Sequence, residues 1–397
     1  MLKQTMDWQL KKGFVRSNAN ILRTIILPIF LFVYPNFSNG QLLKKTTDWI
    51  IHHALIDTTT PGQPSFRFYP TVAYAPETNL EIGFITVYLY QAKKDTNNRI
   101  SELNAFTFYT LQKQYGLWLD NAIYGDRDKW FVLGRTRFQR FPLLYFGVGP
   151  NSSAEYPATV DANYLLFRQR VLRKVVPNLF VGPEVDYQSL FNTAVIHEKN
   201  DPNKEIPAGS AGTSNLGVGG AIVYDNRHNV LNVRKGLFAE LGLLHYSKSL
   251  GSTNQITGTN IDVRSYTPVN KRNVLAVQLI GNFLTGDVPF NQMALMGGES
   301  MMRGYYTGRY RDKTMVAGQA EYRLLPFSFS KRIGATLFAS GAMVAPSPGA
   351  LSTNDLKVTA GAGLRYLAFS KKDIYMRLDV GVTKEGINFY LFTGEAF

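Results

Sequence analysis

Apolar and polar residues alternate one by one along long stretches of the chain after about residue 65. In the segment YMRLDVGV, Met376, Leu378 and Val380 fall on one side of an extended chain, and Arg377 and Asp379 fall on the other. The same alternation recurs in VAGQAEYRL, KVTAGAGLRYL and LFAELGLL. A period of two residues indicates β-strands with one apolar face. No stretch after about residue 57 shows the period of an amphipathic helix, so the pattern predicts an all-β body.

The length of these segments separates two architectures. Strands in soluble proteins average about 5–6 residues, whereas a strand that crosses a bilayer at a tilt needs about 9–11 residues. The alternating segments run to about 10 residues, and the face opposite the apolar one carries Arg, Glu, Asp, Gln and Gly. We therefore predict a transmembrane antiparallel β-barrel of about 16 strands, an even number as in bacterial barrels. The predicted strands are 66–75, 80–92, 102–113, 115–124, 128–138, 160–174, 178–190, 214–226, 235–248, 258–268, 272–285, 313–325, 331–344, 357–368, 372–383 and 386–396.

The connections between these segments alternate between short and long. VVPN, PVNKRN and AFSKKD are short, whereas the stretches 140–159, 191–213, 286–312 and 345–356 are long. Outer-membrane barrels have short periplasmic turns and longer outward loops. If Phe397 ends on the periplasmic side, the strand count assigns these three short connections to the periplasm and these four long ones to the outside.

The first 40 residues have the layout of a secretory signal peptide. Basic residues precede the short apolar run IILPIFLFVY, and small residues lie just before Gln41. The run covers only about half of a bilayer core, which argues against a membrane anchor. We expect residues 1–40 to be removed, residues 41–64 to form a short periplasmic segment, and residues 65–397 to form a barrel in the cell outer membrane. The sequence leaves open whether 41–64 fill the lumen, lie on the inner leaflet or stay without structure.

The composition narrows the possible partners. The 397 residues include no cysteine, which excludes disulfides and thiolate metal sites, and they carry a net charge of +14 from 43 basic and 29 acidic residues. Basic, aromatic-rich chains can bind nucleic acid, but an exported barrel does not meet it routinely. We therefore assign the excess charge to contacts with the headgroups of outer-membrane lipids.

No motif in the sequence indicates an enzyme, a cofactor site or a metal site. The five histidines lack the spacing of ligands that converge on zinc, and no phosphate-binding loop is present. His245 ends an apolar strand face, where a serine lipid hydrolase would need a histidine. An ordinary interfacial histidine is the favoured interpretation.

One stretch, GGESMMRGYYTGRYRD at residues 297–312, breaks the alternating pattern. Its glycines permit sharp turns and a close approach to a wall, and Arg303 offers five donors in a planar fork that fits a carboxylate. Exposed loops seldom carry tyrosine so densely. We therefore predict that this longest loop, between the eleventh and twelfth strands, folds into the barrel. The alternative is a solvated outward loop.

Several motifs resemble the bacterial surface antigen superfamily, whose barrels assemble outer-membrane proteins or export partner proteins. Each motif alone is weak, but together they occur in order and at the expected strands. They are the loop signature at Met302, Arg303, Gly304 and Tyr305; a turn motif at Asp225, Arg227 and Gly236; the strand AGQAEYRLLPF with Glu321 in the acid position; and a terminal assembly signal at Ile387, Phe389, Leu391, Gly394 and Phe397.

The resemblance implies that Arg303 pairs with acids on the strands that follow the loop. Alternation places Glu321 on the lumen face of its strand. The family has a second acid on the next strand, where this chain has Ser340. We therefore expect Glu321 to be the main anionic partner, with Ser340 as a neutral one. The family's POTRA domains need more residues than 41–64 provide, so we expect a short member without them.

Two functions remain open. By resemblance, the barrel would aid insertion or translocation of unfolded outer-membrane proteins, an exported protein or lipids, through a loosely paired seam between its first and last strands. A loose seam exposes strand edges that closed barrels normally abolish. The alternative is a passive pore or structural barrel without assembly activity.

Overall fold

The computed structural model describes residues 63–397, except for 154, 156–157, 198–205, 228–231 and 370–372. All of the described residues belong to one compact unit. The expected signal peptide, the segment 41–62 and the histidines at 52, 53 and 228 lie outside the described residues.

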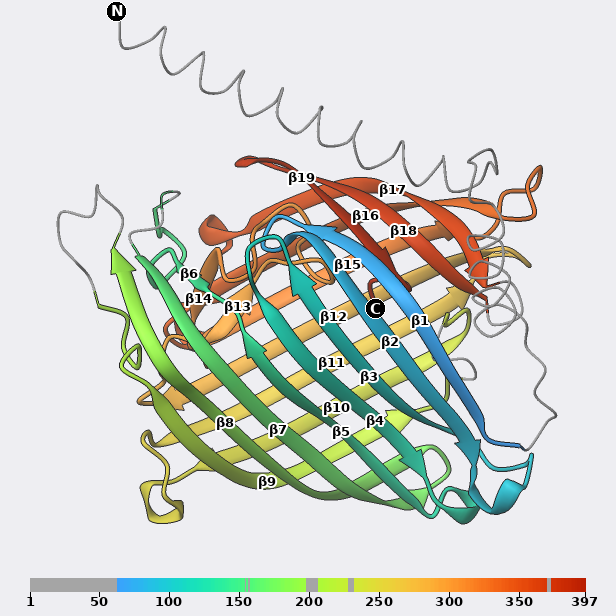
Figure 1. Ribbon diagram of the computed structural model, residues 1–397, viewed down its shortest axis with the longest axis horizontal. Helices are drawn as coiled ribbons and strands as arrows, with labels where there is room; N and C mark the ends of the chain where they lie inside the picture. Colours follow the sequence, from blue (N-terminus) through green and yellow to red (C-terminus); the bar gives the residue numbers. More distant parts are fainter. Residues whose placement is uncertain (1–62, 154, 156–157, 198–205, 228–231, 370–372) are drawn as a thin grey trace, which may run out of the picture. The chain divides into compact units, whose positions relative to one another are not determined.

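Sixteen antiparallel strands of the described chain form one closed barrel (Figure 1). Neighbours in sequence are neighbours in the sheet, and the first strand closes the barrel by pairing with the last. The barrel strands are β1 Ser65–Ala75, β2 Asn79–Gln91, β3 Ile100–Thr110, β4 Tyr115–Tyr124, β5 Trp130–Arg140, β7 Ala158–Val176, β8 Leu179–His197, β9 Thr213–Asp225, β10 Gly236–Tyr246, β11 Ile256–Pro268, β12 Asn273–Gly286, β15 Thr314–Leu324, β16 Ile333–Ala345, β17 Lys357–Phe369, β18 Ile374–Thr383 and β19 Gly386–Thr393.

Three short strands and five single turns of 3-10 helix lie in the connections. None of the helical turns in the described part of the chain is long and apolar enough to cross a membrane. The short strands are β6 Leu143–Tyr145, which pairs with β7, and β13 Ala294–Met296 and β14 Tyr310–Asp312, which pair with each other. The helical turns are η2 Ala92–Lys94, η3 Asp126–Asp128, η4 Lys248–Leu250, η5 Pro348–Ala350 and η6 Thr353–Asp355.

The predicted all-β barrel is confirmed, and each of the sixteen predicted segments overlaps one barrel strand. Two boundaries differ from the prediction. Strands β7 and β8 extend to 19 residues each, because β7 continues beyond β5 and pairs there with β6. Strand β19 ends at Thr393 rather than near residue 396, because Gly394 adopts a φ of 94° and its N–H bonds the carbonyl of Tyr375 at 2.8 Å.

The two ends of the barrel differ in their connections. The near end holds the start of β1 and the end of β19. The far end holds the end of β1 and the start of β19. Near-end connections include the two-residue turn between β7 and β8, whereas the far end carries the 27-residue connection 287–313 between β12 and β15. We call residues 287–313 the long loop.

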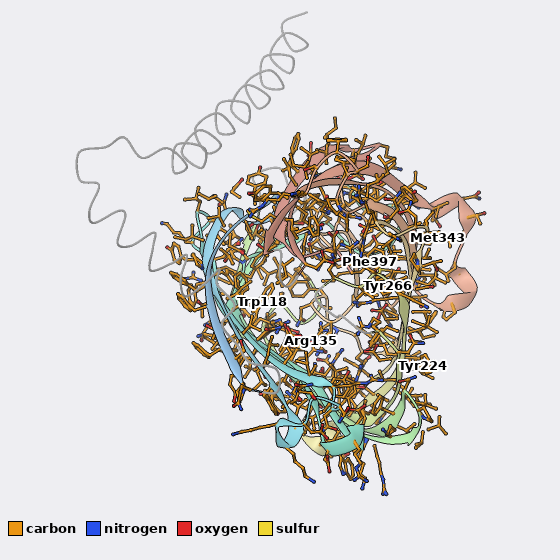
Figure 2. All side chains as sticks on the ribbon, turned by 90° about the vertical axis from the view of Figure 1, so that its right-hand side faces the viewer. Trp118, Arg135, Tyr224, Tyr266, Met343 and Phe397 are labelled. Carbon is orange, nitrogen blue, oxygen red and sulfur yellow. The ribbon has the colours of Figure 1, made fainter. Side chains whose placement is uncertain are left out.

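The strand alternation separates an apolar outer face from a polar inner face. On β17, Val358 and Leu364 are each 59% exposed, whereas Thr359 and Arg365 are buried. In the view of Figure 2, Arg135 and Phe397 lie inside the ring of strands. This division is the one expected of a barrel with lipid outside and a polar lumen inside.

Candidate functional site

Arg303 of the long loop is buried against the strands that follow it. Its guanidinium Nη1 donates to Asp379 Oδ2 of β18 at 2.6 Å, and its Nη2 donates to Glu321 Oε1 of β15. All three side chains are fully inaccessible to solvent. The structure thus brings together the predicted pair of Arg303 and Glu321, and it adds Asp379 as a second carboxylate.

The two carboxylates are shared with three further arginines. Arg323 Nε donates to Glu321 Oε2 at 2.8 Å, and Asp379 accepts from Arg365 at 2.5 Å and from Arg377 at 3.1 Å. Arg365 Nε also donates to Glu395 of the C-terminal tail at 2.9 Å. We call this group the arginine cluster: Arg303, Arg323, Arg365, Arg377, Glu321, Asp379 and Glu395. It joins the long loop, three strands and the chain end, and each of its four arginines has a carboxylate partner out of water.

Strand β16 contributes an aromatic face to the cluster and not the expected hydroxyl. The Arg303 guanidinium carbon lies 3.6 Å from the centre of the Phe338 ring, in a cation–π contact. Ser340 is two residues further along β16 and is 7% exposed. Its Oγ atom has no hydrogen-bond partner among the described residues, so the structure does not give Ser340 a hydrogen bond to Arg303.

Two facing glycines let the loop backbone approach β18. A Cβ atom on Gly304, which has a φ of 116°, would lie 2.6 Å from Thr383 Cγ2. A Cβ atom on Gly381 of β18 would lie 2.3 Å from the Arg303 carbonyl oxygen. Both distances are shorter than any tolerated contact, so this docking requires glycine at both positions.

The residues that flank Arg303 form the apolar floor of the site. Met302 and Tyr305 are 0% and 1% exposed, and they pack with Met301, Met315 and other buried side chains of β13 to β16. Met302 has a φ of 57°, a left-handed backbone conformation that residues other than glycine and asparagine rarely adopt. The tight turn it forms is closed by the Tyr305 N–H, which bonds the Met302 carbonyl at 3.1 Å.

The long loop also contacts β19 and the turn before it. Gly304 N donates to the Tyr390 hydroxyl at 3.0 Å, and Asn388 Nδ2 donates to the Gly304 carbonyl at 2.6 Å. Arg309 Nε and the Tyr310 hydroxyl bond the two carboxylate oxygens of Glu385 at 2.7 and 2.5 Å. These bonds attach the loop to the last strand of the barrel.

On the other side of the barrel closure, the same loop holds the turn between β1 and β2. The Thr307 N–H and its hydroxyl both donate to Glu77 Oε1, at 2.6 and 3.0 Å. Glu77 is 5% exposed. Burial raises its pKa to about 7, although the bonds from Thr307 oppose the shift and the nearby Glu299 adds to it. The loop therefore contacts both strands that close the barrel.

We call the boundary between β1 and β19 the seam. Its register consists of a single pair, Tyr74 with Leu391, in the described residues. By contrast, β18 and β19 pair continuously from Met376 with Thr393 to Thr383 with Gly386. In Figure 1 the first strand, in blue, and the last strand, in dark red, lie beside each other at this boundary.

The predicted turn motif comes together at the near end, away from the loop. Arg227 donates from Nε and Nη2 to the two oxygens of Asp225 at 2.9 and 2.8 Å, and it lies 4.4 Å from the centre of the Phe238 ring. Gly236 has a φ of 129°, and a Cβ there would lie 3.0 Å from the Arg227 backbone. These contacts fix the connection between β9 and β10.

The residues of the predicted terminal signal divide between two environments. Ile387 and Phe389 are 58% and 37% exposed on the outer face of β19, and Leu391 shares that face. Phe397 is not on the strand. Its ring centre lies 4.9 Å from the Arg323 guanidinium, and its carbonyl accepts from Arg323 at 3.0 Å. Whether these residues act as an assembly signal stays a prediction.

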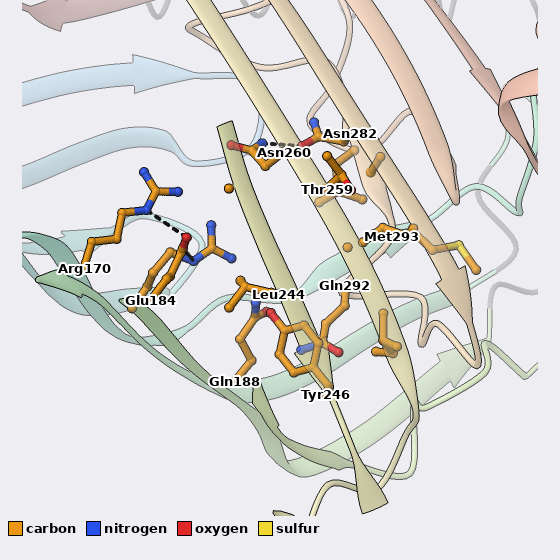
Figure 3. Close-up of a pocket in the computed structure, with 17 residues that line it drawn as sticks. Arg170, Glu184, Gln188, Leu244, Tyr246, Thr259, Asn260, Asn282, Gln292 and Met293 are labelled. Atoms are coloured by element: carbon orange, nitrogen blue, oxygen red, sulfur yellow. Dashed lines mark hydrogen bonds and ion pairs between the residues drawn. The ribbon is translucent and has the colours of Figure 1, made fainter. Parts of the chain in front are cut away.

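A second ionic group lines a cavity of about 190 Å³ beneath the loop (Figure 3). Arg170 is 3.0 Å from Glu184 and donates to Glu240 at 2.7 Å. Tyr246 donates its hydroxyl proton to Asp186 at 2.8 Å, beside Arg168. Both arginines of this cavity have acid neighbours, so neither is left unpaired for an anionic ligand.

No group of three or more His, Asp and Glu side chains in the described part of the chain could hold a metal ion. His245 Nδ1 lies 2.8 Å from the hydroxyl of Thr257 on the neighbouring strand, which fits an ordinary interfacial histidine. What the arrangement can do is mechanical: it holds a loop across a weakly paired boundary.

Sequence reasoning missed several residues of the site, among them Asp379, Glu77, Glu385 and Tyr390. Alternation in YMRLDVGV already placed Asp379 on the polar face of its strand. Its distance from Glu321 depends on how the tilted strands lie around the barrel. Glu77 lies 230 residues from Thr307 in the chain, and no local pattern could have joined the two.

The fold and the loop define a class of barrels whose long loop carries an arginine bound to acids of the wall. Residues 141–368, more than half of the chain, match the family model of the Omp85 superfamily domain. The chain belongs to the Omp85 superfamily, and it is an outer-membrane β-barrel. Whether the long loop occupies the lumen in the membrane stays a prediction.

Two solved structures share the fold. One is BamA from Haemophilus ducreyi lacking POTRA domains 1–3, with a TM-score of 0.54 and 13% identity over 83% of this chain and 70% of that one. The other is CdiB from Acinetobacter baumannii, with a TM-score of 0.51 and 9% identity over 83% of this chain and 65% of that one. The chain therefore spans less than two thirds of the CdiB chain. A comparison with functionally curated proteins finds no match.

Proposed function

We propose that this barrel aids the insertion or translocation of proteins at the outer membrane, through opening of the seam between β1 and β19. The observation that carries the proposal is the single register pair at the seam, in a barrel whose other strands pair along their length. A strand edge with unpaired N–H and C=O groups is a template for an incoming extended chain. The family membership supports the same role.

The short contact lowers the barrier to opening. Each backbone hydrogen bond in the lipid-facing wall is costly to leave unmade, because lipid offers no replacement. A continuous ladder would therefore have to be replaced along its whole length before the wall could open. At the seam, only the region around Tyr74 and Leu391 must separate. A client strand that pairs with the exposed edge would then satisfy the freed groups.

The long loop supplies the control that a weak seam needs. The arginine cluster anchors its tip to β15 and β18, and the loop bonds both Glu77 next to β1 and Tyr390 on β19. While these bonds are made, β1 and β19 are held by side chains as well as by their short backbone contact. Opening of the seam then requires release of the loop from at least one of the two strands.

Export and topology belong to the same proposal. Residues 1–40 direct the chain out of the cytoplasm, residues 41–64 stay in the periplasm, and the near end of the barrel faces the periplasm. Cell fractionation with carbonate washing would recover the chain in the outer membrane, and recovery in the soluble periplasm would contradict the proposal. The clients are unfolded outer-membrane proteins or an exported protein.

The test closes the seam with a reversible cross-link. The chain has no cysteine, so Tyr74→Cys with Leu391→Cys would place one disulfide across the seam. Leu364→Cys with Leu378→Cys would place a matched disulfide between β17 and β18, whose residues are also in register. The barrel is reconstituted in liposomes, and the rate at which an unfolded outer-membrane protein inserts is measured before and after reduction.

The proposal predicts that the oxidised seam pair inserts clients several-fold more slowly, and that reduction restores the rate. The β17–β18 pair should insert clients at the wild-type rate in both states. Insertion at an unchanged rate through an oxidised seam would contradict the proposal. A barrel that never accelerates insertion, but gives a steady conductance in planar bilayers, would be the passive pore instead.

A further inference from the structure

The exposed positive charges of the barrel are concentrated at its near end. We consider the near-end connections and the last four residues of each strand there. In the described residues of this region, one acid, Asp95, is exposed. Ten basic side chains are exposed, and we call them the basic rim: Lys93, Lys94, Arg127, Lys129, Arg173, Lys235, Lys271, Arg272, Lys331 and Arg332.

The far end, defined in the same way, is nearly balanced. Among its described residues, the exposed bases are Lys113, Arg140, Lys248 and Lys384, and the exposed acids are Glu155, Asp287 and Glu385. The positive charge of the chain is thus not spread evenly over the two ends of the molecule. Since exposed charges of one sign repel each other, the basic rim is a feature that an anionic partner would stabilise.

Exposed apolar side chains accompany the basic rim. Phe329 is 83% exposed and its ring stacks on Phe327 at 5.0 Å, in the same connection as Lys331 and Arg332. Trp130 is 49% exposed on the outer face, and the Arg173 guanidinium lies 5.8 Å from its ring centre. Apolar groups beside cations are typical of the boundary between acyl chains and headgroups, where aromatic rings anchor and basic side chains reach the phosphates.

We propose that the basic rim binds the phosphate groups of anionic phospholipids in the leaflet at the near end of the barrel. The connections that carry it end strands that cross the membrane, so they lie at the depth of the headgroups. The ten bases come from five different connections and from the end of β7, around the barrel rather than from one concave patch. That distribution suits a ring of separate lipid headgroups better than a single acidic protein. The inference does not depend on the proposed insertion activity.

The test uses two variants that remove equal charge from opposite ends. The near-end triple replaces Lys129, Lys271 and Lys331 with Gln, and the far-end triple replaces Lys113, Lys248 and Lys384 with Gln. All six lysines are near or beyond strand ends, and the structure gives their ammonium groups no hydrogen bond or ion pair, so both variants should fold. The full barrel is placed in phosphatidylcholine bilayers, and the association of spin-labelled phosphatidylglycerol is compared with that of spin-labelled phosphatidylcholine.

The wild-type barrel should associate with phosphatidylglycerol several-fold more strongly than with phosphatidylcholine. A basic residue near an anionic surface contributes about a fivefold preference, so the near-end triple should lose most of the selectivity while the far-end triple keeps it. Raising the salt to about 0.5 M should reduce the wild-type selectivity, because screening shortens the range of the attraction.

Three results would overturn the inference. The wild-type barrel could show equal association with both lipids. Both triples could lose selectivity to the same extent, which would make the effect one of net charge. The wild-type barrel could lack lipid selectivity but bind a polyglutamate chain in a way that the near-end triple abolishes. That third result would identify an acidic protein as the partner.

Discussion

The seam and the boundary between β17 and β18 close the same barrel by different means. Strands β17 and β18 are in register from Ala360 with Val382 to Leu367 with Tyr375, and after a bulge Phe369 pairs with Ile374. The seam has one register pair, and side chains of the long loop connect the strands on either side of it. A backbone ladder depends little on which side chains are present, whereas the seam depends on a few identifiable ones. Point substitutions should therefore loosen the seam without affecting the rest of the wall.

The largest effect is expected from Arg303→Ala. Loss of one member of a buried ion pair costs roughly 3–5 kcal/mol. Here Glu321 keeps Arg323, and Asp379 keeps Arg365 and Arg377, so we expect the lower end, about 3 kcal/mol. The loop should become accessible to protease, and the single-channel conductance should rise.

Arg227→Ala is the control for that substitution, because it removes a paired arginine at the near end. It should weaken the β9–β10 connection and leave the loop protected. An exchange of charges, Arg303→Glu with Glu321→Arg, should not restore the loop, since residue 303 would then face Asp379. Unchanged protease protection, conductance and heat-modifiable mobility in Arg303→Ala would mean that the cluster does not hold the loop.

The methyl group added by Gly381→Ala should push the long loop away from β18. None of the residues of the arginine cluster is replaced in this variant. The added methyl group would lie 2.3 Å from the Arg303 carbonyl, and overpacking of this kind typically costs about 1–3 kcal/mol. Gly349→Ala is the matched control, because nothing lies within 4 Å of the added atom. Loop protection against protease should fall only in Gly381→Ala. Equal protection in the two variants would contradict the close docking.

A smaller effect follows from the pKa of Glu77. Burial raises this pKa from 4.5 to about 7 in the docked state, against the opposing hydrogen bonds from Thr307, so the docked state holds the proton more tightly than a solvent-exposed turn would. The stabilisation of the docked loop by protonated Glu77 is fully present below about pH 4.5 and is lost as the pH rises through about 7. Loop release should therefore increase roughly 70-fold between pH 5 and pH 8. Glu77→Gln should remove this pH dependence and keep the loop docked. A wild-type barrel whose loop release does not vary with pH would exclude the role of Glu77.

The smallest effect concerns the chain end. Phe397→Ala removes the ring that lies on the Arg323 guanidinium, a contact worth about 0.5–1 kcal/mol, and it keeps the carbonyl that Arg323 bonds. The midpoint of thermal unfolding should fall by a few degrees at most, and loop protection should not change. A large loss of loop protection would show that the tail supports the cluster more strongly than its contacts indicate.

The sequence predicted the barrel well because the governing signal is local. Lipid outside and polar contacts inside force alternation at every strand, so the sixteen segments could be read one at a time. Arg303 and Glu321 could be joined because the family resemblance implies the pairing and alternation places Glu321 on the polar face of the strand that follows the loop. Asp379 and Glu77 could not, because their positions depend on strand tilt and on barrel closure. The inward turn of Phe397 was missed because it depends on the φ of Gly394 and on the attraction of Glu395 to Arg365.

The most direct test of the account is the distance between β1 and β19 with the loop docked and released. Spin labels at Val72→Cys and Phe389→Cys report on the seam, and labels at Leu364→Cys and Leu378→Cys report on the β17–β18 boundary; these are exposed outer-face positions. Pulsed electron paramagnetic resonance in nanodiscs would compare each pair with and without Arg303→Ala. We predict that Arg303→Ala broadens and lengthens the seam distances and leaves the β17–β18 distances unchanged. Identical seam distances with and without Arg303, or equal broadening at both boundaries, would contradict the account.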